Sequence, residues 1–166
     1  MKNLNDKEIE KVYKIVKSFD EGLLVNPQEE WEQDYYDEKL IDKKGLKQIL
    51  RKLKSSTSKG SISKAEKEVL VRRYDTFNNI IDENVERNAT KAFNQRLALE
   101  MEYFSMERAE FSKRKVDIYA NNSKYIVGYC HSRNAIRKFR ISRIGKAKIT
   151  TNKYEIPNSF NKKDYL

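Results

Sequence analysis

LALEMEY, at residues 97–103, decides the fold of the second half of this chain. Apolar side chains alternate there with small or acidic ones, and a period of two is typical of a β-strand with one buried face. Further stretches with strand character follow at residues 111–119, 125–130, 136–141 and 147–151. Turn-forming residues separate two pairs of them, at Asn121–Ser123 and Ser132–Asn134. Several short strands at this spacing predict a small antiparallel barrel or sandwich.

The residues before Leu97 have the period of helices instead. Apolar side chains recur every three or four residues in Ile9–Phe19 and Leu46–Leu53, and we expect one long helix over Lys64–Phe93. Asn5 with Glu8 has the spacing of a capping box at a helix start. A further capping box is expected at Ser63 with Glu66, and Gly45 is expected to end a helix.

Two other features of the helical part bear on its organisation. Asn26 followed by Pro27 predicts the start of a helix that carries Trp31, Tyr35 and Tyr36. The serine-rich stretch 55–61 has the composition of a linker. We therefore predict an α+β protein with a helical N-terminal region at 1–96, a joint at 55–61, a β-barrel at 97–153 and a C-terminal tail at 154–166. The residues expected to be buried are Tyr74, Phe77, Ile81, Leu99, Ile126, Val127 and Ile141.

Composition excludes several classes of protein. No apolar run approaches the roughly 20 residues that a membrane span needs, and the N-terminus lacks the apolar centre of a signal peptide, so we expect a cytoplasmic protein. Cys130 is the only cysteine and lies in an apolar strand, which predicts a buried, reduced thiol. His131 is the only histidine, and adjacent side chains of a strand point to opposite faces. We therefore expect no enzyme, no bound metal and no cofactor.

Positive charge is concentrated in the β half. Between Phe111 and Lys153 there are twelve lysines and arginines and one acidic residue, Asp117, in a chain whose formal net charge is +10. Aromatic side chains are interleaved with these cations. A folded surface of this kind attracts phosphate, and its aromatic rings can stack on unpaired bases. A small β domain with solvated lysines is the alternative interpretation.

Part of this cationic stretch resembles a known family. Residues 125–144, YIVGYCHSRNAIRKFRISRI, combine a Tyr-apolar-x-Gly-Tyr-Cys strand, an arginine in the following turn and an Arg-x-Phe-Arg-x-x-Arg-Ile ending. This pattern resembles the WYL domain of bacterial transcription regulators and defence-associated proteins. The resemblance covers about residues 97–151 and implies a five-stranded antiparallel Sm-like β-barrel. Lys124-Tyr125-Ile126 stands where Trp-Tyr-Leu is typical.

The resemblance also implies a site and a class of ligand. WYL domains are associated with a basic and aromatic groove that binds nucleotides or nucleic acid. The positions of this chain that match are Arg137 and Arg143, as the expected centre, with Arg133, Arg140, Tyr125 and His131 around them. Alternation in a strand places Arg137, Phe139, Ile141 and Arg143 on one face and Lys138 and Arg140 on the other, unless a turn intervenes near Ser142.

Three functions stay open at this point. The leading interpretation is a regulatory module that binds single-stranded nucleic acid or a nucleotide-type ligand. The second is an accessory protein of a phage-defence or CRISPR system, with Trp31, Tyr35, Tyr36 and the Leu46–Leu53 stripe as partner surface. The third is a DNA-binding repressor, although the winged helix-turn-helix that usually precedes a WYL domain is not evident in residues 1–96. The oligomeric state is open, and a homo-oligomer is compatible with each function.

Overall fold

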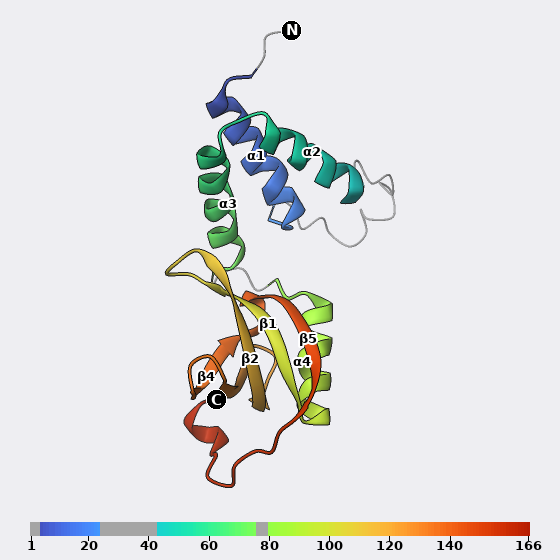
Figure 1. Ribbon diagram of the computed structural model, residues 1–166, viewed down its shortest axis with the longest axis vertical. Helices are drawn as coiled ribbons and strands as arrows, with labels where there is room; N and C mark the ends of the chain where they lie inside the picture. Colours follow the sequence, from blue (N-terminus) through green and yellow to red (C-terminus); the bar gives the residue numbers. More distant parts are fainter. Residues whose placement is uncertain (1–3, 24–42, 76–79) are drawn as a thin grey trace, which may run out of the picture. The chain divides into compact units, whose positions relative to one another are not determined.

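The computed structural model describes residues 4–23, 43–75 and 80–166. The chain forms two compact units, Met1–Arg73 and Tyr74–Leu166, which are described separately (Figure 1). The predicted helix with Trp31, Tyr35 and Tyr36, and also Phe77, lie outside the described residues.

The described part of the first unit consists of α1 (Asp6–Asp20), α2 (Lys43–Ser55) and α3 (Lys59–Arg73). The predicted capping box starts α1, since the Asn5 side chain accepts from the backbone N–H of Glu8 while the Glu8 carboxylate accepts from that of Asn5. The small core contains Tyr13, Leu50, Ile62 and Ala65. Leu46 and Leu50 are buried, at 7% and 8% exposed. Two residues of the Leu46–Leu53 stripe are therefore core in this unit, whereas Ile49 is 38% exposed and Leu53 is partly buried. A partner surface at this stripe stays a prediction.

The serine-rich stretch is a short turn between two helices. Helix α2 continues through Gly45 to Ser55 and α3 begins at Lys59, so the predicted break at Gly45 and the capping box at Ser63 are both wrong. The hydroxyl of Ser58 accepts from the backbone N–H of Ser61 at 3.3 Å, which supports a helix start one turn earlier. Two helices around a tight turn, which were not evident in the sequence, are thus present in the first unit.

A partly buried hydrogen bond links α1 to α3 in this unit. The Tyr13 hydroxyl donates to Glu66 at 2.7 Å, and Lys54 lies 2.5 Å from the same carboxylate. Burial raises the pKa of Tyr13, and its hydrogen bond to Glu66 raises it further. Burial also tends to raise the pKa of Glu66, but the hydrogen bonds from Lys54 and Tyr13 outweigh burial and hold that pKa below its ordinary value of 4.5.

This arrangement predicts a pH-dependent stability of the first unit. A carboxyl whose pKa is lower in the folded state stabilises the fold above its unfolded pKa, and the contribution is lost as pH falls through the folded pKa. Glu66→Gln should therefore lower the thermal midpoint of helical circular dichroism at about pH 6 and have little effect near pH 3. An equal lowering at both pH values would show that the Glu66 charge is not the source.

The long helix predicted over Lys64–Phe93 is wrong, because the chain leaves the helix after Arg73 and starts a new one at Glu83. Helix α4 (Glu83–Gln95) is capped by Asp82, whose carboxylate accepts from the backbone N–H groups of Asn84 at 2.8 Å and Val85 at 3.2 Å. A carboxylate at a helix N-terminus satisfies free N–H groups and complements the helix dipole. The helical spacing of apolar residues continues from α3 into α4, so the sequence pattern gives no sign of the break between the two helices.

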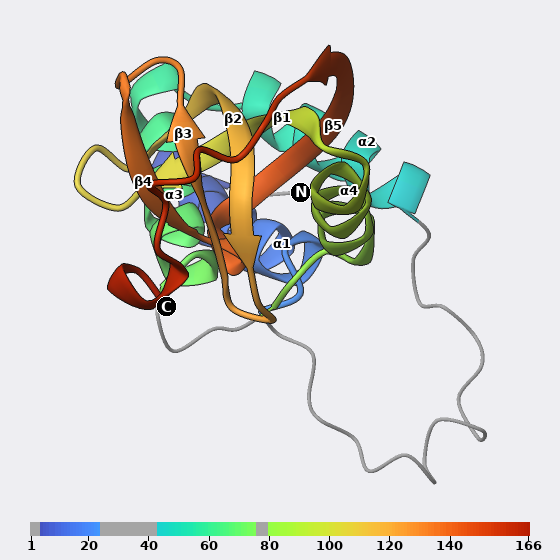
Figure 2. The same cartoon turned by 90° about the horizontal axis from the view of Figure 1, so that it is seen from below.

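Helix α4 precedes a five-stranded antiparallel sheet of β1 (Leu97–Ser105), β2 (Glu110–Asn121), β3 (Tyr125–Cys130), β4 (Ala135–Arg140) and β5 (Ile144–Lys153). All five strands lie where the sequence predicts them. Their order is β4-β3-β2-β1-β5, so β4 and β5 are the two edges among the described residues (Figure 2). The predicted closed barrel is therefore not found. The 3-10 helix η2 (Ile141–Arg143) takes the chain from one edge to the other instead of pairing them.

The core of the second unit lies between α4 and one face of the sheet. Val85, Ala89 and Ala92 of the helix pack with Leu99, Val116 and Ile126 of the strands, and both cartoon views draw α4 alongside β5 (Figures 1 and 2). Of the residues expected to be buried, Tyr74, Leu99, Ile126, Val127 and Ile141 are buried and Ile81 is partly buried. Cys130 is fully buried, as predicted.

Because α4 packs on the sheet, the compact units divide between Arg73 and Tyr74. The sequence places its boundary at residue 96, where the period of the apolar residues changes from about 3.6 to two. A change of period marks the end of a helix, but it does not tell against which element that helix packs.

Candidate nucleic-acid interface

A set of charged side chains covers the sheet face opposite the core on β2, β1 and β5. The strand register sets Glu100 of β1 beside Lys115 of β2 and Lys148 of β5. One step along the strand, Glu102 lies beside Lys113 and Lys146 in the same way. The middle strand thus carries two carboxylates, and each flanking strand carries two ammonium groups. This face results from the period of two, which sends Leu99 and Met101 into the core and the glutamates outward.

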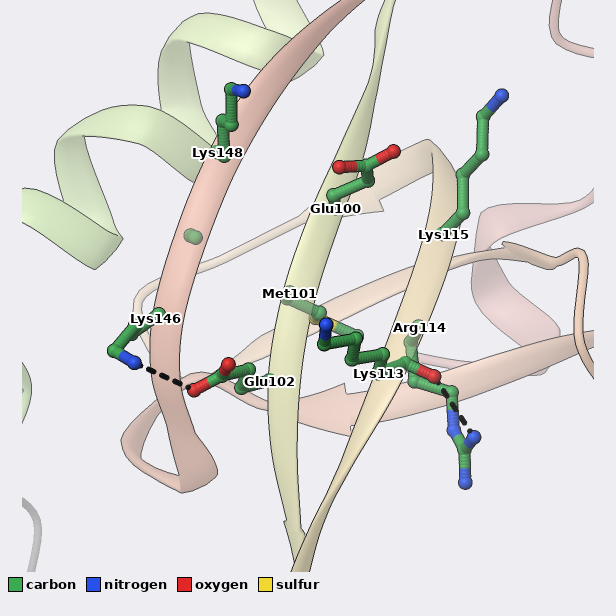
Figure 3. A pocket seen from close by; sticks show the side chains of 9 residues that line it. Glu100, Met101, Glu102, Lys113, Arg114, Lys115, Lys146 and Lys148 are labelled. Carbon is green, nitrogen blue, oxygen red and sulfur yellow. Dashed lines mark hydrogen bonds and ion pairs between the residues drawn. The ribbon is translucent and has the colours of Figure 1, made fainter.

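The twisted surface of these strands encloses a hollow of about 510 Å³ (Figure 3). It is lined by Glu100, Met101, Glu102, Lys113, Arg114, Lys115, Lys146, Ala147 and Lys148. We call this surface the lysine hollow. Lys146 lies 3.1 Å from the Glu102 carboxylate, and Lys115 donates to the side-chain oxygen of Asn152 at 3.1 Å. Figure 3 shows Glu100 between Lys148 and Lys115.

The lysine hollow is positive in sum. Five cations and two carboxylates line it, so its formal charge is 5 − 2 = +3. Like-signed charges around a hollow focus the field and raise the local concentration of an oppositely charged ligand. The sequence predicts the cations of this surface, since all five of them fall in the acid-poor stretch from residue 111 to residue 153. It misses Glu100 and Glu102, because only the register reveals that they lie among the lysines.

The arginines expected to form the centre of the site are not gathered in one groove. Arg137 lies on β4 opposite Gly128 and is exposed, on the same strand face as the buried Phe139. After Arg140 the chain enters η2, so the alternation stops before Arg143. The turn that the sequence analysis allowed for near Ser142 is therefore present, and it separates Arg143 from Arg137.

Arg140 and Arg143 both have partners inside the second unit. Arg140 donates through Nε to the Ser142 hydroxyl at 3.0 Å and lines a smaller hollow of about 230 Å³ with Ile81, Ser123, Lys124 and Ser142. Arg143 donates through Nε to the backbone carbonyl of Tyr74 at 3.3 Å. The Arg143 side chain thus helps to hold the first residue of this unit against the sheet.

The remaining predicted residues lie on or near β3. The Lys138 ammonium is 4.3 Å from the centre of the Tyr125 ring and donates to the backbone carbonyl of Tyr165 at 2.8 Å. His131 follows β3 in an exposed turn, and its Nε2 is 3.0 Å from an Asp117 carboxylate oxygen. Arg133 is exposed in that turn. Ligand binding stays a prediction for all six residues inferred from the WYL resemblance, which are Tyr125, His131, Arg133, Arg137, Arg140 and Arg143.

No cluster of three or more His, Cys, Asp or Glu side chains suitable for a metal ion occurs at residues 4–23, 43–75 and 80–166. Within those same ranges, no helix is both long and apolar enough to cross a membrane.

Comparison with protein families decides what the second unit is. Residues 85–149 match the family model of the WYL domain. This chain contains a WYL domain. The match begins inside α4, so it includes the helix that packs on the sheet as well as the strands. The resemblance inferred from residues 125–144 is thereby confirmed.

Comparisons with individual proteins add little to the WYL assignment. Among solved structures, the chain is similar to proteasome accessory factor B/C (PafBC) of Arthrobacter aurescens, with 18% identity and a TM-score of 0.37. That alignment covers 91% of this chain and 21% of PafBC, so the chain spans about a fifth of the length of that protein. No curated protein matches the sequence.

Proposed function

We propose that this protein is a regulatory module that binds single-stranded nucleic acid or a nucleotide-type ligand on its WYL domain. The lysine hollow is the observation that carries the proposal, because it joins a net positive charge to a concave surface of the size of a ligand site. The presence of a WYL domain supports the same class of ligand.

The residues inferred from the WYL resemblance are a second part of the proposal, separate from the lysine hollow. Tyr125 offers a ring for base stacking, and Arg137 and Arg133 are exposed cations at the β3–β4 side of the sheet. Arg140 and His131 lie on the same side of the sheet as Tyr125 or in the adjoining turn. Arg143 has the weakest case among them, because its Nε is bonded to the Tyr74 carbonyl.

The test is a binding screen of labelled single-stranded DNA, single-stranded RNA, duplex DNA and mononucleotides at two salt concentrations. Each phosphate contact to a single strand contributes about −0.7 to the slope of log affinity against log salt. Four contacts should therefore weaken binding about fiftyfold between about 50 and 200 mM salt. Absence of binding to every probe at low salt would overturn the proposal and favour the accessory-protein function.

A pair of matched variants tests the arginines separately. Arg137→Ala with Arg143→Ala should weaken binding and flatten the salt slope, because each arginine removed takes away one phosphate contact. Lys162→Ala with Lys163→Ala removes the same charge from the tail and should do much less. An equal loss of affinity in both variants would show that the arginines act only through general positive charge and do not form a site. The thermal midpoint of the arginine variant must be measured, since Arg143 has a structural contact.

A second candidate function is binding of duplex DNA through the first unit. Helix α2 carries six lysines and arginines and no acidic residue, and Lys44, Lys47, Gln48 and Arg51 share one hollow of about 370 Å³. The short turn from α2 to α3 is typical of helix-turn-helix proteins. The net charge of residues 1–96 is near neutral and does not reflect this local concentration. Preference for duplex over single strands in the same screen would favour this function.

A further inference from the structure

The two carboxylates in the lysine hollow are not explained by phosphate binding. Glu100 and Glu102 lie on its middle strand, where they would repel a phosphate group placed over β1. Glu102 has an ion pair with Lys146 at 3.1 Å, whereas Glu100 is exposed and makes no ion pair among the described residues. A solvated row of cross-strand charge pairs accounts for Glu102. It accounts less well for Glu100, which is flanked by two lysines and paired with neither.

Glu100 is a hydrogen-bond acceptor between two rows of lysines, and this arrangement indicates which chemical groups a ligand must carry. The lysine rows on β2 and β5 are separated by β1, so their strands are about 10 Å apart. A carboxylate accepts hydrogen bonds and donates none, so its partner must offer N–H groups. The Watson–Crick edge of an unpaired guanine offers two N–H donors side by side, at N1 and at the 2-amino group. Thymine and uracil have no amino group, and the carbonyl oxygens on either side of their single N3–H would face the carboxylate.

We propose that the lysine hollow binds an unpaired guanine, with Glu100 accepting from N1–H and the 2-amino group and with Lys113, Lys115 and Lys148 contacting the adjoining phosphates. This inference rests on the proposed function, and it names the base that the same surface selects. The hollow has the volume of a small-molecule site, and a flexible single strand can present a base with its Watson–Crick edge free. Glu102 remains paired with Lys146 and positions that lysine at the rim of the hollow.

The test compares four single strands of equal length. One is all thymine, one carries isolated guanines among thymines, one has inosine in place of guanine, and one has cytosine there. Inosine keeps N1–H and lacks only the 2-amino group. Wild-type protein should bind the guanine strand at least about fivefold more tightly than the thymine strand, because a good bidentate contact discriminates bases by this factor or more. The inosine strand should lie between them.

Glu100→Gln separates base selection from general electrostatics. Its amide retains the shape of the carboxylate but places a donor where one acceptor was, so the preference for guanine should fall to about twofold or less. The affinity for the thymine strand should stay or rise, since a negative charge is removed from a positive hollow. The control is Glu155→Gln, which removes the same charge at an exposed position outside the hollow and should leave the preference unchanged.

The outcomes distinguish this inference from the proposed function. Equal affinity of wild-type protein for all four strands, with a steep salt slope, overturns guanine selection and leaves nucleic-acid binding standing. A guanine preference that survives Glu100→Gln overturns the assignment to Glu100. Absence of binding to any strand overturns both.

Discussion

Gly128→Ala is expected to destabilise the WYL domain by about 3 kcal/mol or more, the upper end of the range for overpacked interiors. A Cβ atom at this position would lie 2.1 Å from the backbone oxygen of Asp117 and 2.9 Å from its carbonyl carbon. Both atoms belong to β2, and Gly128 pairs with the next residue, Ile118. The clash is with a central strand, whose backbone cannot move without breaking its ladder on both sides.

The measurement is the midpoint of urea unfolding followed by fluorescence and circular dichroism. Gly60→Ala serves as the matched control, because a Cβ there meets nothing within 4 Å and the residue lies in α3. That control should gain up to about 1 kcal/mol from helix propensity. A Gly128→Ala protein with an unchanged midpoint would contradict the close approach of β2 and β3.

Removal of two lysines from the hollow is expected to have the largest effect on binding. Lys113 and Lys148 lie on opposite sides of β1, and both are exposed. Their replacement by alanine leaves the Lys146–Glu102 pair and the Lys115–Asn152 contact intact. Affinity for a single strand at low salt should fall at least about tenfold, and the salt slope should flatten by about 1.4 for two lost phosphate contacts.

Fluorescence anisotropy titrations at several salt concentrations measure both quantities. The tail variant Lys162→Ala with Lys163→Ala carries the same net charge and controls for long-range attraction. If the two double variants lose affinity equally, the hollow is not a formed site. A melting temperature equal to that of wild type would exclude unfolding as the cause of any loss.

The local patterns of this sequence predicted local structure well. The alternation at residues 97–103 and the apolar run at 125–130 depend on side chains within one strand, so all five strands were found. The helix end after Arg73 was missed because apolar spacing continued across it, and only the capping contacts of Asp82 identify the new start. Gly45 was misinterpreted because a helix tolerates glycine when its apolar face is packed.

The candidate site was harder to predict, because it depends on pairing between distant residues. Glu100 and Lys148 are far apart in the chain and become neighbours only through the register of β1 and β5. The sequence analysis placed the arginines in one site because they belong to one continuous segment. The 3-10 helix η2 interrupts that segment, and Arg143 donates a hydrogen bond to the Tyr74 carbonyl instead. A linear stretch of charge therefore indicates that a surface is cationic, but the sheet determines which cations share it.

The unpaired edge of the sheet has a consequence for how these cations are studied. An edge strand offers unused backbone N–H and C=O groups, and proteins discourage association through such edges with charged side chains, lysine above all. Strand β4 carries Arg137, Lys138 and Arg140. These charges oppose pairing of this edge with a second copy of the chain, in addition to the binding role proposed for Arg137 and Arg140. Alanine at these positions removes charges that oppose aggregation through the edge strand. Arg137→Lys keeps the positive charge and removes only the planar guanidinium that can form two parallel hydrogen bonds with phosphate.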